Sequence, residues 1–244
     1  MTRQTPAATV VYAIGDIHGR LDLLERIQQR IVDDAMQREA SRRQVVYLGD
    51  YLSRGPDSAG VVDRVREWLP AGFERITLKG NHEDLLLRFL EGEIGTGRHW
   101  LDYGGLEVMS AYGVVIADRE ARDDASVIAM RKDLAARIPA SHLEFFRGLQ
   151  ISHSAGDYFF VHGGVRPGVP LAEQSDRDCL WIRKTFLNSD ADHGAIVVHG
   201  HSISDQPEIR HNRIGIDTGA YCSNVLTCLV LDGEVRSFLQ TASP

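Results

Sequence analysis

The sequence contains few cysteines and no long apolar run, and both absences argue against whole classes of protein. Its 244 residues include three cysteines, Cys179, Cys222 and Cys228, without Cys-x-x-Cys spacing. An odd number of cysteines in this arrangement argues against a disulfide framework and a cysteine zinc site, so we expect a reducing, cytoplasmic location. No stretch approaches the roughly 20 apolar residues that a membrane span needs, and the N-terminus shows no secretory pattern. We therefore predict a cytoplasmic protein that does not enter a membrane.

Basic residues are also scarce relative to acidic ones. Lysine and arginine together number 27 against 34 aspartates and glutamates, which gives a net charge of −7. This charge disfavours a nucleic-acid scaffold as partner, although individual arginines can still bind a single phosphate. Hydrophobic residues make up 43% of the chain, enough to bury one core. We predict a single domain over residues 1–244, and the sequence leaves its oligomeric state open.

Short apolar runs recur along the chain, each bounded by glycine or polar residues. Their β-branched and aromatic content is typical of buried strands. The runs are Val10–Ile14, Val45–Leu48, Arg75–Leu78, Tyr158–Val161, Ala195–Val198, Ile214–Ile216 and Val225–Leu231. Between the first few runs lie segments with helical spacing, the second of them preceded by a plausible cap at Asp57 or Ser58. Strands alternating with helices predict a layered α/β fold, with central β-sheets flanked by helices.

Residues 83–149 break this alternation. Apolar residues at helical spacing follow Glu83, and a glycine-broken stretch, Trp100 to Gly113, separates them from a second helical segment. We predict a helical insertion beside the sheets, within the same domain. Its segment Trp100 to Gly105 is expected either to line a substrate cleft or to pack internally, and the sequence does not distinguish the two.

Polar motifs directly follow several of the predicted strands. They are GDIHG from Gly15, GD at Gly49, GNHE from Gly80, HGG from His162 and GH at Gly200. In open α/β sheets, ligands bind outside the carboxyl ends of the strands, so we expect these loops to converge on one crevice. The adjacent glycines allow tight turns and a close approach of the backbone to a metal or phosphate.

The side chains in these loops are carboxylates, imidazoles and one carboxamide. This mixture suits manganese, iron or zinc better than calcium or magnesium alone. Asp16 and His18 are two residues apart, so in an extended chain both can reach one ion, while Asp50 could bridge to a second. Two ions about 3.5–4 Å apart can activate a water and stabilise an in-line displacement at phosphorus. The pattern therefore predicts phosphate-ester hydrolysis at two divalent metal ions.

In this order, the motifs resemble the signatures of the phosphoprotein phosphatase family of metallophosphoesterases, which are GDxHG, GDxxDRG and GNHE. The chain reads GDIHG from Gly15, GDYLSRG from Gly49 and GNHE from Gly80. Later motifs resemble the bacterial serine/threonine phosphatase branch; these are HGGVRPG from His162, LWIR from Leu180, GH at Gly200 and GIDTGA from Gly215. The resemblance spans nearly the whole chain and implies a calcineurin-like metallophosphoesterase fold.

The resemblance also implies which residues bind metal. Asp16 and His18 would bind the first ion, and Asp50 would bridge to the second. The other ligands of the second ion would be Asn81, His162 and His201. The cofactors would be two divalent metal ions, expected to be Mn²⁺, with iron or zinc as alternatives.

Three further residues match the catalytic positions of the family. Arg54 and Arg183 would bind the phosphate oxygens through paired donors. His82 would protonate the leaving group, a contribution typically worth about 10²–10⁴-fold. The attacking group would be a water activated by the metals, so no phosphoenzyme is expected.

The implied activity is that of a metal-dependent phosphomonoester hydrolase. We predict a serine/threonine protein phosphatase that acts on a phosphorylated protein or a small phosphoester. A symmetrical dinucleoside tetraphosphatase is the alternative, because it resembles the same family and the motifs do not separate the two. A third hypothesis is a regulatory or binding module that keeps the fold with impaired catalysis.

One position departs from the family pattern. The second aspartate of GDxxDRG, which supports the catalytic histidine, is replaced by Ser53. A hydroxyl carries no charge and stabilises a protonated imidazole less than a carboxylate does, so we expect a lowered pKa for His82.

Some candidate site residues also have ordinary structural explanations. Asn81 and His82 could cap a helix that begins near Glu83. Arg183 could form a surface ion pair. His199 lies two residues before His201, but the GH pattern selects His201, and we predict that His199 is structural.

Overall fold

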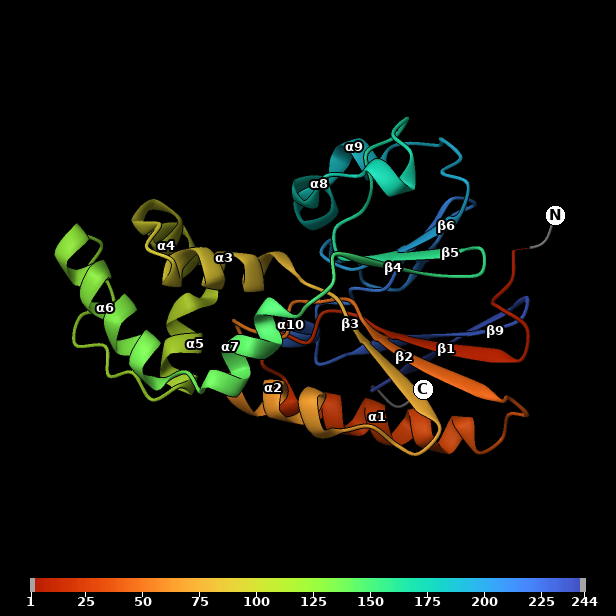
Figure 1. Ribbon diagram of the computed structural model, residues 1–244, viewed down its shortest axis with the longest axis horizontal. Coiled ribbons are helices and arrows are strands. Elements are labelled where there is room, and N and C mark those ends of the chain that lie inside the picture. The colour runs from red at the N-terminus through yellow and green to blue at the C-terminus, as the bar shows by residue number, and fades with distance from the viewer. Residues whose placement is uncertain (1–2, 242–244) are drawn as a thin grey trace.

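The computed structural model describes residues 3–241 and contains two five-stranded β-sheets with helices on their outer faces (Figure 1). The first sheet has the strand order β10-β9-β1-β2-β3, and the second has the order β4-β5-β6-β8-β7. Strands of the first sheet are β1 Thr9–Ile14, β2 Arg42–Tyr47, β3 Phe73–Thr77, β9 Thr227–Asp232 and β10 Val235–Gln240. Strands of the second are β4 Ser152–Ala155, β5 Tyr158–Val161, β6 Ile196–His199, β7 Glu208–Ile209 and β8 Arg213–Gly215. The predicted α/β fold with central sheets flanked by helices is confirmed.

Side chains that alternate along the strands create the layers. On β1, Val11 and Ala13 belong to the core between the two sheets, whereas Tyr12 belongs to the core beneath the helices. The same division holds on β5, where Phe160 faces the first sheet and Phe159 packs with the helices that cover the second. Because successive side chains of a strand point to opposite faces, strands that are apolar throughout can be buried on both sides.

Three strands were absent from the sequence prediction. β4 is rich in serine, β7 has two residues, and β10 is partly exposed at the sheet edge. Their registers depend on antiparallel pairing with neighbours, β4 with β5, β7 with β8 and β10 with β9. Pairing of this kind leaves little trace in local hydrophobicity.

The outer helices follow the predicted spacing. Helix α1, Leu21–Ala35, and helix α2, Ser58–Glu67, cover the first sheet. Asp57 is the cap of α2, because its carboxylate accepts a hydrogen bond from the backbone N–H of Gly60 at 2.7 Å. Over the second sheet lie α8, Asp176–Trp181, and α9, Lys184–Leu187, while α10, Ala220–Ser223, follows β8. None of the helices in residues 3–241 has the length and apolarity needed to cross a bilayer.

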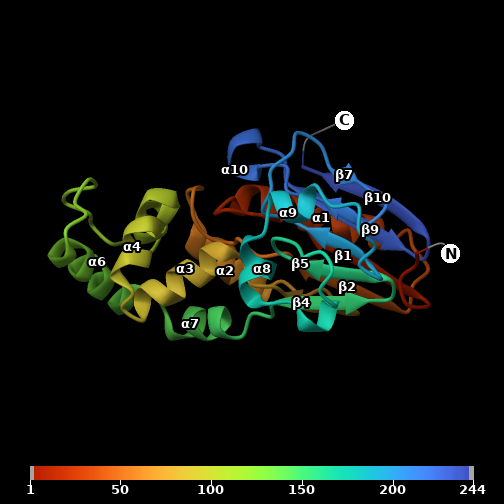
Figure 2. The same ribbon diagram turned by 90° about the horizontal axis from the view of Figure 1, so that it is seen from above.

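The predicted insertion is helical and extends beyond the sheets (Figure 2). Its helices are α3 Asn81–Leu90, α4 Ile94–Trp100, α5 Leu106–Ala111, α6 Asp124–Arg137 and α7 Ala140–Arg147. A kinked turn over Leu101–Gly105 joins α4 to α5. The first helix begins before Glu83, with Gly80 at its N-cap, so the proposed capping role of Asn81 and His82 is wrong and both lie in the first turn.

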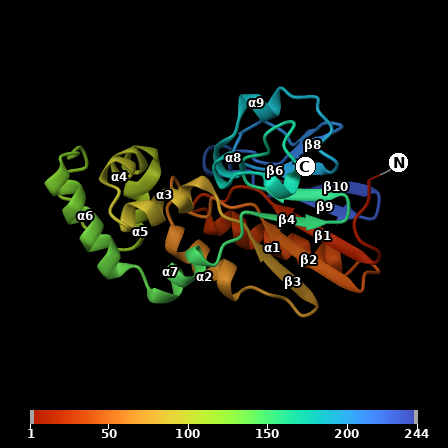
Figure 3. The ribbon, with the colours of Figure 1, turned by 45° about the horizontal axis from the view of Figure 1, so that its top comes forward.

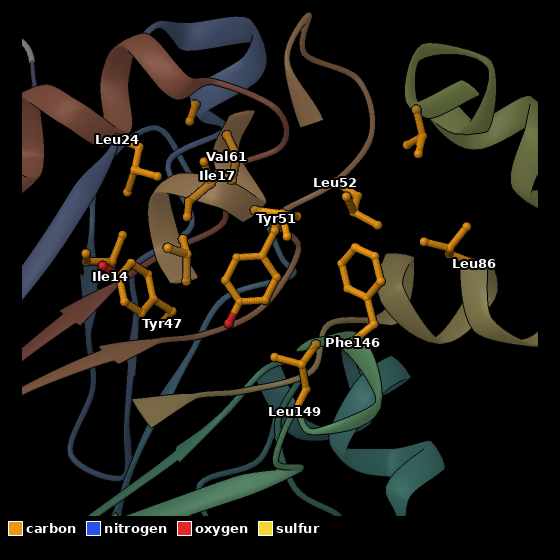
Figure 4. Packing of buried hydrophobic residues seen from close by; sticks show 14 of the residues in the cluster. Ile14, Ile17, Leu24, Tyr47, Tyr51, Leu52, Val61, Leu86, Phe146 and Leu149 are labelled. Carbon is orange, nitrogen blue, oxygen red and sulfur yellow. The ribbon is translucent and has the colours of Figure 1, made fainter. Parts of the chain in front are cut away.

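The insertion shares its core with the sheets. Leu86 of α3 and Phe146 of α7 belong to the same buried cluster as Tyr51 and Leu52, which follow β2 (Figure 4). Contacts of this kind fix the insertion against the loop that carries Asp50. They support the single domain with a helical insertion that the sequence predicts, and this division of the chain stays a prediction.

Candidate metal centre

The loops that follow five parallel strand ends bring the predicted metal ligands together. β1 precedes Asp16 and His18, β2 precedes Asp50, and β3 precedes Asn81. In the second sheet, β5 precedes His162 and β6 precedes His201. All six predicted ligands are buried, with exposed fractions of 6% or less. Buried groups of this polarity need partners or ions, which makes their convergence chemically informative.

Asp50 lies between two groups of histidines. Its ligand atoms lie within 4.8 Å of those of His18 and His82 on one side, and of His162 and His201 on the other. The carboxylate oxygen Oδ2 is 3.5 Å from Nε2 of His18, and Oδ1 is 3.5 Å from Nε2 of His162. Because each oxygen faces a different histidine, Asp50 is suited to bridge two cations.

Backbone carbonyls set the tautomers of two histidines. Nδ1 of His18 is 2.8 Å from the carbonyl of Leu52, and Nδ1 of His162 is 3.0 Å from that of Leu48. A carbonyl only accepts, so each Nδ1 carries the proton and each Nε2 presents a lone pair. Nε2 of His162 then lies 2.8 Å from Oδ1 of Asn81, which is also an acceptor. A cation would relieve the repulsion between these lone pairs, so the donor set fits a divalent metal.

Asp16 lies close to the two groups of histidines around Asp50 but belongs to neither. Its Oδ2 accepts a hydrogen bond from the backbone N–H of His201 at 3.0 Å, and its Oδ1 is buried with no hydrogen-bond partner in the described part of the chain. Burial and the neighbouring Asp217 and Asp50 raise the pKa of Asp16 well above its ordinary value. The unpaired oxygen leaves Asp16 free to bind an ion, and its assignment as a ligand stays a prediction.

Asp217 is a site residue that sequence reasoning did not single out. It is 2% exposed, interacts with Asp16 and accepts a hydrogen bond from the N–H of Gly219 at 2.9 Å. The residue is part of the GIDTGA motif, which begins at the last residue of β8, and that position at a strand end was the available signal.

Without cations, the site is poor in positive charge. Burial raises the pKa of Asp50, with a further contribution from Glu83. Burial also lowers the pKa of His18 to about 4 and that of His201 to about 3. The imidazoles are therefore neutral at pH 7, the form in which histidine binds metals. Bound divalent ions would supply the positive charge needed to stabilise these carboxylates in their ionised form.

Glu83 is a second residue whose role went unrecognised, although it belongs to the GNHE motif. Its carboxylate accepts hydrogen bonds from four backbone N–H groups, those of Asp50, Tyr51, Leu52 and Gly80, at 2.9–3.2 Å. Burial raises its pKa to about 7, against the opposing effect of these donors. Glu83 thereby ties the Asp50 loop to the start of α3. A Cβ at Gly80 would collide with Asp50, so this close approach requires glycine.

The two predicted phosphate-binding arginines lie on different sides of the site. Arg54 is exposed, donates to the hydroxyl of Tyr221 at 3.1 Å and stacks over that ring at 4.7 Å. Tyr221, which was not predicted, also packs edge-on against His18. Arg183 donates through Nε to Nε2 of His201 at 2.9 Å. No acidic side chain of residues 3–241 forms an ion pair with either arginine, so the surface ion pair considered for Arg183 is absent there.

The Arg183 contact has a consequence for metal binding. A neutral imidazole has one ring nitrogen with a lone pair that can accept a hydrogen bond or bind a metal. In His201 this nitrogen is Nε2, which accepts the hydrogen bond from Arg183. A cation bound by His201 must therefore displace this hydrogen bond, which would release Arg183 to bind phosphate.

Backbone strain is concentrated at the site. Seven non-glycine residues in the described chain have positive φ, and five of them are His18, Asp50, Ser53, Arg54 and His201. Such conformations cost on the order of 1–3 kcal/mol each and persist where the surrounding structure enforces them. Three of these five are predicted metal ligands, and the other two, Ser53 and Arg54, form the turn that carries a predicted phosphate-binding arginine.

Ser53 and His82 each have a buried polar atom without a partner among residues 3–241. Ser53 is fully buried, and within these residues neither its Oγ nor the Nδ1 of His82 has a hydrogen-bond partner. Burial, assisted by the positive charge of Arg54, lowers the pKa of His82 well below its usual range. The carboxylate that the family resemblance places at this position, in support of the histidine, is absent from this chain.

The glycine-broken segment of the insertion packs internally through Trp100, and its lining of a substrate cleft stays a prediction. Trp100 is fully buried and packs on Phe89 at 5.3 Å. Tyr103 is 49% exposed and packs against His99, with ring centroids 4.3 Å apart. His199 packs against Phe186 in the core, consistent with its predicted structural role.

Comparison with known proteins identifies the family. The family model for calcineurin-like phosphoesterases matches residues 9–226. The chain belongs to this family. Metallophosphoesterase chemistry and the use of divalent metals follow from that membership, and the buried Asp and His groups around Asp50 fit it.

The related proteins carry names that refer to nucleotides. The chain is 24% identical over 236 residues to the asymmetrical bis(5'-nucleosyl)-tetraphosphatase PrpE of Oceanobacillus iheyensis, covering 88% of this chain and 85% of that protein. It is 30% identical over 156 residues to a symmetrical bis(5'-nucleosyl)-tetraphosphatase of Dechloromonas aromatica, covering 64% of this chain and 44% of that protein. The bacterial serine/threonine phosphatase branch predicted from the motifs is not confirmed by these relatives.

Solved structures share the fold. A protein provisionally described as a diadenosine tetraphosphatase superimposes with a TM-score of 0.63 at 17% identity, covering 98% of each chain. A cold-active protein tyrosine phosphatase superimposes with a TM-score of 0.57 at 17% identity, covering 97% of this chain and 81% of the other. At this identity the likeness shows the calcineurin-like fold, which was predicted, and does not identify the substrate.

Proposed function

We propose that the protein is a metal-dependent dinucleoside tetraphosphatase, which is the alternative left open by the motifs. The observation that carries the hydrolytic chemistry is Asp50, whose two oxygens face separate groups of histidines. The names of relatives that align over most of the chain support the nucleotide substrate. Protein serine/threonine phosphatase activity, the first prediction from sequence, stays an unconfirmed competitor.

The proposed chemistry assigns each group a role. Asp16 and His18 would bind one divalent cation, Asn81, His162 and His201 the other, and Asp50 both. When bound, the two cations would neutralise phosphate charge and activate a water. We assign manganese to both positions, with iron or zinc as alternatives, because the donors are nitrogen and oxygen with no thiolate.

The arginines would bind the phosphate group from two sides. Arg54 approaches from the His18 side through its contact with Tyr221, and Arg183 from the His201 side. Neither guanidinium has an acidic partner in the described chain, so both can donate to phosphate oxygens. Their charge would also stabilise the transition state.

Ser53 supports an anhydride substrate over a phosphoserine ester. Hydrolysis of a phosphoserine expels an alkoxide, a strong base that needs a proton from an acid such as His82. Hydrolysis of a dinucleoside tetraphosphate instead expels a nucleotide through a phosphate oxygen, which is stable as an anion. Since Nδ1 of His82 has no partner and Ser53 carries no charge, proton donation by His82 is weakly supported. An enzyme that hydrolyses anhydrides depends less on proton donation to the leaving group.

Substrate comparison tests the proposal. We expect the manganese-supplemented protein to hydrolyse diadenosine tetraphosphate with a higher kcat/KM than a phosphoserine peptide. Chromatography of the products then identifies the cleaved bond, since symmetrical cleavage yields two ADP and asymmetrical cleavage yields AMP and ATP. Preference for the phosphopeptide would instead favour the protein phosphatase. Metal binding without turnover of either substrate or of an aryl phosphate would favour the impaired regulatory module.

A further inference from the structure

Two clefts lie close to predicted metal ligands, one near His18 and one near His201, and they differ in chemistry. The first is lined by Gly19, Arg54 and Tyr221 on the His18 side and has a volume of about 640 Å³. The second lies between α3, α4 and α8, on the His201 side, and has a volume of about 830 Å³. We call the second one the α3–α8 cleft. Its walls lie side by side in Figure 3, where α8 stands next to α3.

Both walls of the α3–α8 cleft carry residues that lie close to predicted metal ligands. Trp181, at the end of α8, packs edge-on against His201 with ring centroids 6.3 Å apart. On the opposite wall, Leu85 lies one helical turn after Asn81 and His82 in α3. A substrate whose reacting phosphate lies at Asp50 could therefore extend its next groups directly into this cleft.

The lining combines an apolar floor with exposed rings. Leu85 and Leu180 are each 3% exposed and form apolar surface. Trp181 is partly exposed, and His99 is exposed at the rim, where it stacks on Tyr103. Flat, partly exposed rings beside apolar surface provide a platform on which a nucleobase can stack.

The charges of the two clefts also differ. Arg177 lines the α3–α8 cleft, is exposed and forms no ion pair with the acids of residues 3–241. Arg88 also lines it, but pairs with Asp84 and Glu93. Asp84 and Asp176 line it as well, so its two arginines are balanced by two carboxylates. The first cleft has Arg20 and Arg54 beside three carboxylates, those of Asp22, Glu25 and Asp57, and its Arg20 is bound to Asp22. The exposed Arg177 can therefore bind a single phosphate in the α3–α8 cleft, whereas the first cleft has an excess of negative charge.

We infer that the α3–α8 cleft binds one nucleoside end of the substrate, with the base against Trp181 and His99 and a phosphate beside Arg177. This inference rests on the proposed dinucleoside tetraphosphatase activity and names the residues that would select that substrate. The helical insertion is then the specificity element of the enzyme, since α3 and α4 form one wall of the cleft.

The test uses His99→Ala and Arg177→Ala in the manganese-loaded protein. Stacking of a base on a ring is worth about 1–3 kcal/mol, or roughly five- to 150-fold in affinity. We expect each variant to raise KM for diadenosine tetraphosphate about fivefold or more, with little change in kcat. Hydrolysis of p-nitrophenyl phosphate, which has no nucleoside, should stay as in the unmodified protein. His211→Ala and Arg147→Ala are matched controls, because both residues are exposed and outside the two clefts.

The outcomes separate the inference from the function on which it rests. If the protein hydrolyses diadenosine tetraphosphate and both variants keep its KM, the cleft assignment is wrong and the function stands. If the protein hydrolyses p-nitrophenyl phosphate and not diadenosine tetraphosphate, the proposed function fails and the nucleoside assignment fails with it. Impaired turnover of a phosphoserine peptide alone would show that the cleft binds peptide, which also overturns the inference.

Discussion

Gly104 lies in the helical insertion, and Gly104→Ala should disturb the turn formed by Ser53 and Arg54. Gly104 has a φ of +104°, and a Cβ there would lie 2.8 Å from the backbone nitrogen of Arg54 and 2.9 Å from Cβ of Ser53. The insertion thus abuts the turn that presents the proposed phosphate-binding arginine. A new methyl group must push the two segments apart.

The expected loss of stability in Gly104→Ala has two contributions, backbone strain and overpacking, and a matched control variant separates them. Placing alanine at a strongly positive φ costs on the order of 1–2 kcal/mol, and overpacking costs about 1–3 kcal/mol more. Gly92 has a nearly identical φ of +106° with nothing within 4 Å of an added Cβ. We therefore expect Gly92→Ala to lower the free energy of unfolding by about 1–2 kcal/mol, and Gly104→Ala by about 2–5 kcal/mol.

Activity should separate the two variants more clearly than stability. A displacement of about 1 Å in a catalytic group can cost about 10²-fold. We expect kcat/KM for p-nitrophenyl phosphate to fall by about that factor in Gly104→Ala and to stay near the original value in Gly92→Ala. Urea unfolding and steady-state kinetics provide both measurements. Equal stability losses and equal activities in the two variants would refute the claim that the insertion supports the Arg54 turn.

Three further predictions concern the metal centre. His82→Asn should retain bound manganese and lose about 10²–10⁴-fold in kcat on a phosphoserine peptide, with a smaller loss on diadenosine tetraphosphate; equal losses would contradict the anhydride argument. Burial raises the pKa values of Asp16 and Asp50 in the metal-free protein. These two groups therefore contribute to the stability of the metal-free protein at a pH below their ordinary pKa values, and this contribution is lost as the pH rises through their raised pKa values. The increase in Tm on adding manganese should accordingly be larger at pH 7.5 than at pH 5, and a calorimetric increment independent of pH would argue against it. Ser53→Asp, at a φ of 75° that aspartate tolerates, should shift the alkaline limb of the pH–rate profile upward as the new carboxylate raises the pKa of His82; an unchanged profile with metal content intact would refute that role.

Sequence reasoning located the strand ends well because those positions carry local signals. Runs such as Tyr158–Val161 are buried on both faces and match the structure at both ends. Glycines flanking Asp16 and Asp50 marked the turns. The convergence of these loops then followed from a general property of α/β sheets.

The residues that were overlooked act through contacts distant in sequence. Glu83 holds the Asp50 loop through N–H groups more than 30 positions earlier, and Tyr221 reaches Arg54 across 167 positions. Asp217 meets Asp16 only after two sheets have packed. No local periodicity encodes such contacts. The same holds for the cleft role of His99, which depends on α8 lying opposite α4.

The position of the cations relative to Asp50 is the most direct test of the account. A crystal of the manganese-loaded protein, with diffraction data collected at a wavelength where manganese scatters anomalously, should show two peaks about 3.5–4 Å apart, one at each oxygen of Asp50. A single peak, or peaks remote from Asp50 and His162, would contradict the proposed dinuclear centre.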